Sequence, residues 1–132
     1  MNNPYANYKN QSLSTMTQGE LLLKLYDELI KQCRIAEIAI GKSDFVTSNN
    51  GVIKAKAIVS TLASSLDMRY PISKELNEFY IFFLQQLSEA NVEGNAKIIG
   101  DIIPLIKDLR ESFDHAEKLN RRNQSAMGGQ AV

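Results

Sequence analysis

Four segments of the chain repeat apolar residues at alternating steps of three and four positions. In an α-helix this spacing places the apolar side chains on one stripe, because one turn takes about 3.6 residues. Such a stripe is stable only when a neighbouring element covers it, as in antiparallel helix packing. The pattern predicts helices over about residues 18–40, 45–68, 72–90 and 96–119.

Residues with capping chemistry mark the beginnings of the first two helices. Thr17 and Glu20 stand three residues apart, so the hydroxyl and the carboxylate can each bind a backbone N–H at a helix start. Asp44 is a candidate N-cap for the second helix. Residues 48–51 are poor helix formers, so a later start, near Asn50, stays open as the alternative.

Glycine and proline predict where the helices end or bend. Gly41 can adopt the left-handed conformation that ends a helix, and Gly94 supplies turn chemistry after the third helix. Pro71 separates the second helix from the third, because the residue before proline avoids the helical region. Pro104 lies inside the fourth helix and predicts a kink, because it has no N–H to donate.

Four amphipathic helices with short connections predict an all-α fold, an antiparallel four-helix bundle. The bundle is expected to span residues 17–119. Residues 1–16 are predominantly polar and predict an extended N-terminal arm, whereas residues 120–132 lack an apolar period and predict a disordered C-terminal tail. No segment shows the sustained period-two alternation of a sheet.

Composition argues against several classes of partner. The 132 residues include 15 basic and 15 acidic side chains, so no net charge favours nucleic acid or an anionic membrane. The longest apolar run, residues 79–84, is far shorter than the roughly 20 residues that span a bilayer. Residues 1–12 lack the pattern of a secretory signal. We therefore expect a cytoplasmic protein without membrane insertion and without a nucleic-acid partner.

The residue types needed for metal binding or catalysis are scarce. The chain has one cysteine, Cys33, and one histidine, His115, too few for a zinc or di-iron site. Glu111 can share a helix face with His115, but two ligands do not make a site. We interpret Cys33 as a small buried apolar residue and His115 as a solvated side chain. The sequence therefore predicts a protein that is not an enzyme and needs no cofactor.

Apolar and aromatic residues exceed what a single bundle core requires. Tyr5, Tyr8 and Leu13 lie in or next to the polar arm, and the first helix has leucines beside its stripe. Ordering an arm costs roughly 1–2 kcal/mol per residue, which buried tyrosine rings can partly offset. This predicts a weakly held arm over an apolar groove, from which a partner helix can displace it. The alternative is that these side chains fill the core and cap one end of the bundle.

Short motifs follow one another from the arm to the fourth helix. In chain order they are Tyr5-x-x-Tyr8, Ser14-Thr15, Glu20-Leu21-Leu22-x-x-Leu25-Tyr26-Asp27, Ala57-Ile58-Val59-x-x-Leu62-x-x-Ser65-Leu66-Asp67, Leu76-x-x-Phe79-Tyr80, Leu87-x-x-Ala90-Asn91 and Ile106-x-x-Leu109-Arg110-x-x-Phe113. Their order and spacing resemble those of the FliS family of flagellar secretion chaperones. The resemblance covers about residues 4–117, although the family more often has tryptophan at the position of Phe113 and a glycine-rich connection in place of Tyr70-Pro71-Ile72.

The resemblance implies a cytoplasmic export chaperone that binds the C-terminal, assembly-prone region of flagellin. It would hold this segment helical and unpolymerised until the flagellar export apparatus, itself a further partner, takes it. We predict that Tyr5 and Tyr8, with Leu13, cap a groove, and that Asp27 and Asp67 orient polar contacts at its rim. The residues predicted to line or support the groove are Leu22, Tyr26, Ile58, Leu62 and Leu66.

Two other classes of function stay open from the residues alone. One is a small enzyme or metal-dependent bundle. The other is a structural, oligomerising bundle without a flagellin client, in which the surplus apolar surface pairs with a second copy. A homodimer in the absence of client would fit the chaperone as well.

Overall fold

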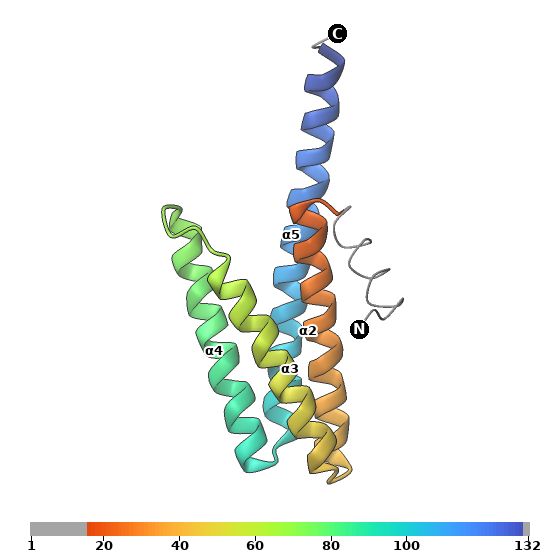
Figure 1. The fold of residues 1–132 in the computed structure, drawn as a ribbon, viewed down its shortest axis with the longest axis vertical. Helices are drawn as coiled ribbons and strands as arrows, with labels where there is room; N and C mark the ends of the chain where they lie inside the picture. The colour runs from red at the N-terminus through yellow and green to blue at the C-terminus, as the bar shows by residue number, and fades with distance from the viewer. Residues whose placement is uncertain (1–15, 131–132) are drawn as a thin grey trace, which may run out of the picture.

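The four predicted helices are present and form an antiparallel bundle (Figure 1). The computed structural model describes the backbone of residues 16–130 and the side chains of residues 16–123. The described residues contain no strand, so the predicted all-α bundle is confirmed. The helices are α2 (Gln18–Gly41), α3 (Phe45–Ser64), α4 (Pro71–Glu93) and α5 (Ala96–Gln130).

The helices pack in a ring that follows the chain order. α2 packs against α3 and α5, and α4 packs against the same two helices, so α2 and α4 occupy opposite corners (Figure 1). The apolar stripes predicted from the sequence meet in the centre of the bundle. The largest fully buried side chains include Tyr26, Leu29, Leu62, Tyr80, Phe83, Leu87 and Ile99.

Both predicted N-caps accept a backbone hydrogen bond. The Thr17 hydroxyl accepts from the Glu20 N–H at 3.1 Å, and the Asp44 carboxylate accepts from the Thr47 N–H at 3.2 Å. α3 therefore begins directly after Asp44, which rules out the later start. The Glu20 carboxylate forms an ion pair with Arg121, so it joins α2 to α5.

Small residues explain why α3 is helical where its sequence is a poor helix former. Ser48 is buried, and its hydroxyl donates to the Phe45 carbonyl at 3.2 Å. A Cβ at Gly51 would lie 3.2 Å from the Gln32 carbonyl oxygen and 3.3 Å from the Ala36 Cβ. Gly51 thus lets the backbones of α2 and α3 approach closely, and this packing outweighs the low helix propensity of the segment.

Two helix ends differ from the sequence prediction. Gly41 is the last residue of α2, but the left-handed residue is Ser43, with φ 57°. α3 ends at Ser64, several residues before Met68. Gly94, with φ 62°, ends α4 in the left-handed conformation that a turn glycine provides.

α5 is longer than predicted. It runs through Pro104 without ending and continues to Gln130, so most of residues 120–132, predicted as a disordered tail, is helical. Arg121 stabilises this extension, because its guanidinium binds Glu117 one turn earlier at 3.1 Å. Together with its ion pair to Glu20 of α2, this contact holds the beginning of the extension against the bundle.

We predict that Gly51→Leu destabilises the bundle by about 1–3 kcal/mol, because the larger side chain would force α2 and α3 apart. Chemical denaturation followed by circular dichroism measures this change. Gly41→Leu is the matched control, since a Cβ there meets nothing within 4 Å. An unchanged midpoint for Gly51→Leu would contradict the close approach of the two helices.

Candidate functional site

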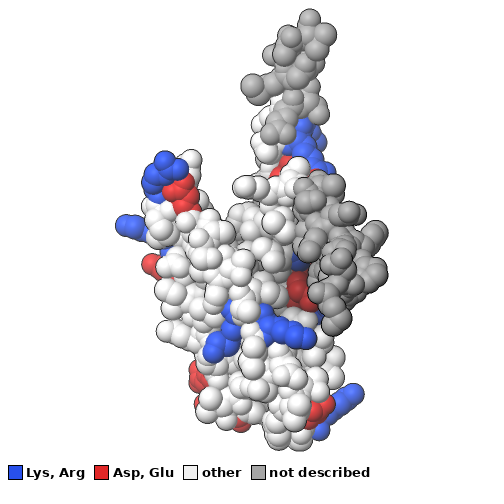
Figure 2. Space-filling model, in the orientation of Figure 1, with Lys and Arg blue, Asp and Glu red and all other residues white. Residues whose placement is uncertain are grey.

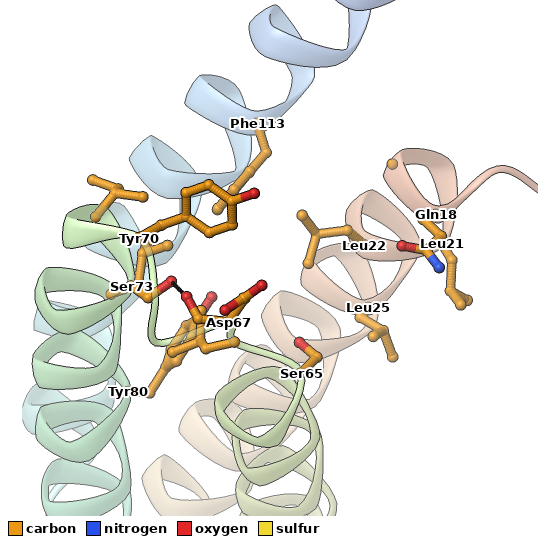
Figure 3. Close-up of a pocket in the computed structure, with 14 residues that line it drawn as sticks. Gln18, Leu21, Leu22, Leu25, Ser65, Asp67, Tyr70, Ser73, Tyr80 and Phe113 are labelled. Atoms are coloured by element: carbon orange, nitrogen blue, oxygen red, sulfur yellow. Dashed lines mark hydrogen bonds between the residues drawn. The ribbon is translucent and has the colours of Figure 1, made fainter.

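A cavity of about 610 Å³ opens at the end of the bundle where α2 begins and α3 connects to α4 (Figure 3). Figure 3 places Leu22 on one side of the opening, with Tyr70 and Phe113 across from it. Its volume lies within the range of about 300–1,000 Å³ that is usual for ligand pockets. The apolar walls are formed by Leu21, Leu22 and Leu25 of α2, Leu66 of the connection, Leu76 of α4 and Phe113 of α5.

The polar rim is held in place by Asp67 in the connection between α3 and α4. Its carbonyl accepts from the buried Ser73 hydroxyl at 2.6 Å, the contact drawn in Figure 3. Its carboxylate accepts from the Arg69 backbone N–H at 3.1 Å and from the Arg69 guanidinium at 2.6 Å. The guanidinium keeps the pKa of the Asp67 carboxyl below its usual value, so the carboxylate is ionised near neutral pH and its charge is paired with that of Arg69.

A pair of buried tyrosines lies at the floor of the cavity. The hydroxyls of Tyr26 in α2 and Tyr80 in α4 are 2.6 Å apart and form a hydrogen bond. The Tyr26 ring also packs against Phe113 of α5, with ring centroids 5.5 Å apart. Burial raises the pKa of both phenols above its usual value, so both hydroxyls keep their protons at physiological pH.

The surface around the cavity carries few charges. In Figure 2, uncharged side chains cover most of the face between the α3–α4 connection and α2, and basic side chains gather lower down, over α3. Among the described residues that line the cavity, Asp67 alone is charged. The site therefore suits an apolar segment better than a strongly charged ligand.

Comparison with known proteins agrees with this geometry. The family model described as "Flagellar protein FliS" matches residues 1–120 of the chain. The chain belongs to the FliS family.

Three relatives within the family carry the name flagellar secretion chaperone FliS. The protein of Bacillus subtilis is 29% identical over 127 residues, which cover 96% of each chain. The protein of Vibrio cholerae is 22% identical over 107 residues, 80% of this chain and 79% of the relative. The protein of Campylobacter jejuni is 27% identical over 111 residues, 83% of this chain and 87% of the relative.

The cavity brings together part of the groove that the sequence predicted for this FliS family member. Leu22, Leu66 and Asp67 line it directly. Tyr26 lies beneath it and reaches the lining through Tyr80 and Phe113. These four predicted residues are therefore neighbours in space, and their part in binding a partner stays a prediction.

Three other predicted residues lie away from the lining. Leu62 is a buried core residue, and Ile58 is partly buried against that core, so both support the bundle below the cavity. Asp27 forms an ion pair with Arg110 of α5, at 2.6 Å, and is half-exposed. Tyr5, Tyr8 and Leu13 lie outside the described residues.

Several lining residues were not predicted as site residues. Tyr70 looked like a simple helix break before Pro71, and Phe113 looked like one more position of the α5 stripe. Both line the cavity, and Figure 3 places them on the side of the opening that faces Leu22. An aromatic residue next to the break before Pro71 was a signal that could have identified Tyr70, whereas no local signal separates Phe113 from the rest of the α5 stripe.

The structure shows no cluster typical of a metal site among the described residues. No three His, Cys, Asp or Glu side chains lie close enough there to hold a metal ion. His115 is exposed, and Cys33 is fully buried in the core, as predicted. Among the residues described, no helix is both long and apolar enough to cross a membrane.

We predict that Cys33 reacts very slowly with a thiol reagent in the native protein. Burial raises the pKa of its thiol from 9.0 to about 12, so near neutral pH the thiolate is about a thousandfold scarcer than at an unperturbed cysteine. Absorbance of the released chromophore measures the rate, with the chemically unfolded chain as the fast control. Rapid stoichiometric labelling of the folded protein would contradict the burial.

Proposed function

We propose that this protein is a cytoplasmic flagellar secretion chaperone that binds the C-terminal segment of flagellin and delivers it, unpolymerised, for export. The observation that carries the proposal is an open apolar cavity of about 610 Å³ at one end of a bundle of the FliS family. The names of the three relatives support the chaperone role. The walls of the cavity support a client that presents apolar side chains.

The energetics favour an amphipathic segment as the client. Such a segment must be ordered when it binds, which costs several kcal/mol. Burying one leucine-sized side chain returns roughly 1.5–3 kcal/mol. Leu22, Leu25 and Leu66 offer a surface against which more than one such side chain can pack. A client segment that is bound to this surface cannot use the same apolar side chains of its own to polymerise.

The position of the N-terminus supports the predicted arm as a cover for the cavity. Gln18 and Gly19, the first residues of α2, line the opening, so residues 1–15 join the bundle at its rim. We propose that Tyr5 and Tyr8, with Leu13, cover the cavity until the client displaces them. A cover of this kind would shield the leucines of α2 from other partners.

Asp27 takes a different part in this proposal from the one predicted for Asp67. The Asp67 carboxylate is bound by Arg69 within the same connection, but it lines the cavity, where a client backbone N–H or side chain can reach it. Asp27 is occupied by Arg110 and joins α2 to α5 on the side of the bundle. We propose that Asp27 contributes through this ion pair, or through a client that extends past the cavity along α2.

We predict that Leu22→Gln weakens binding of a flagellin C-terminal peptide at least about tenfold, because an amide replaces apolar surface at the cavity wall. Isothermal titration calorimetry measures the affinity. Ile38→Gln is the control: Ile38 lies on the same helix, is 55% exposed and does not line the cavity. Equal affinities for the two variants would place the client elsewhere.

We predict that replacing Tyr5 and Tyr8 together by alanine changes client affinity while the helix content stays nearly the same. The rings compete for the cavity in this proposal, so removing them should strengthen binding by a few-fold. Titration with the same peptide measures the change, and circular dichroism checks the fold. Unchanged affinity would show that the arm has no role in binding.

A structural, oligomerising bundle is the second candidate function, and one observation favours it. Phe79 and Phe82 of α4 are 39% and 40% exposed and, with Glu75 and Glu78, line a separate depression of about 310 Å³. A second copy, or a component of the export apparatus, could cover these rings. Sedimentation with and without the flagellin peptide separates the candidates: a peptide-indifferent homodimer supports the structural role, and a one-to-one complex supports the chaperone.

A further inference from the structure

The tyrosine pair beneath the cavity holds one more hydroxyl hydrogen than its mutual bond can use. Tyr26 and Tyr80 contribute two O–H groups, and the hydrogen bond between their oxygens consumes one hydrogen. Among the described residues, neither hydroxyl has a further hydrogen-bond partner. One hydroxyl hydrogen of the pair therefore stays available for another acceptor.

The surroundings of the two rings indicate which hydroxyl can offer this hydrogen to the cavity. Both side chains are almost fully buried, at 0% and 1% exposure for Tyr26 and Tyr80. Tyr80 is part of the cavity lining and Tyr26 is not. Figure 3 shows Tyr80 at the base of the site, below Asp67 and the connection. Either hydroxyl can donate in this bond; when Tyr26 donates to Tyr80, the Tyr80 hydrogen is free for an acceptor in the cavity.

We infer that the Tyr80 hydroxyl donates a hydrogen bond to an uncharged acceptor of the client segment, which makes the tyrosine pair a specificity-determining element at the floor of the apolar cavity. The acceptor is a backbone carbonyl at the end of a client helix or the carboxamide of an asparagine or glutamine. Carbonyls at a helix C-terminus lack intrahelical donors and suit this role. The inference rests on the proposed function of the cavity as the client site.

The charges around the site favour a neutral acceptor over a carboxylate. The described lining contains no lysine or arginine, and its single charged residue is Asp67. The nearby Arg69 guanidinium is already bound to Asp67. A client carboxylate would lose its hydration without gaining a cation, which is unfavourable in a buried site. A carbonyl or carboxamide loses less and gains the phenol donor.

The inference predicts unequal effects of two changes that each remove one oxygen. Tyr80→Phe should weaken binding of the flagellin C-terminal peptide about tenfold, the effect of one lost hydrogen bond in a buried site. Tyr26→Phe should weaken it less, about threefold at most, because the Tyr80 hydroxyl remains. Both changes should lower thermal stability, since each leaves the other phenol without its partner. Calorimetric titration and thermal melts measure the two quantities.

Val59→Ala supplies a control for destabilisation alone. Val59 is fully buried in α3, outside the cavity lining, so its truncation lowers stability without touching the site. If Val59→Ala keeps the affinity of the parent chain and Tyr80→Phe loses about tenfold, the inference holds. If Tyr26→Phe loses as much affinity as Tyr80→Phe, the pair is a structural element and the inference is wrong.

The variant Leu22→Gln separates failure of this inference from failure of the proposed function. If Tyr80→Phe binds the peptide as tightly as the parent chain while Leu22→Gln binds weakly, the cavity is the client site but needs no acceptor at Tyr80. If both variants bind like the parent chain, the client does not use the cavity and both proposals fall.

Discussion

The architecture depends on the requirement that the phenol of Tyr26, placed in the centre of a helix bundle, find a hydrogen-bond partner. That partner is Tyr80 of α4, the helix at the opposite corner, and the bond between the two hydroxyls is 2.6 Å long. Because Tyr26 also packs on Phe113, three helices meet at one side chain. Removing either phenol alone would leave the other without its buried hydrogen-bond partner, which lowers the stability of the fold. It therefore sets the relative positions of α2, α4 and α5 at the floor of the cavity.

Above this contact, the bundle opens because α3 ends before its neighbours. The chain leaves α3 after Ser64, and the Ser65 hydroxyl binds the Leu62 carbonyl at 2.7 Å, as a side chain does at a helix end. The first turns of α2 then extend past the last turn of α3, so Leu21, Leu22 and Leu25 line a cavity. Apolar surface that a longer α3 would bury is left open here, and this surface is the client site that we propose.

Part of the cavity lining was predicted from the sequence pattern, and the rest depends on contacts between residues that are distant in the chain. Leu22 and Leu66 were predicted because they lie on or beside apolar stripes, and they line the cavity. Asp27 was predicted at the rim but forms an ion pair with Arg110, 83 residues away in sequence. No local signal connects those two residues. Tyr70 entered the site for a similar reason, since its position depends on the path of the α3–α4 connection.

The fold, like the site, has features that the sequence pattern predicts and features that depend on contacts between distant residues. Periodicity, caps and turn residues in the sequence are sufficient to predict four helices and an antiparallel bundle, because each of these signals lies within one or two turns of the chain. They are not sufficient for the helical path through Gly51 or for the extension of α5 past the core. Gly51 is helical because α2 approaches it closely, and the extension is stabilised by Arg121 binding to Glu20. These features depend on residues distant in the chain, so they arise only when the helices pack.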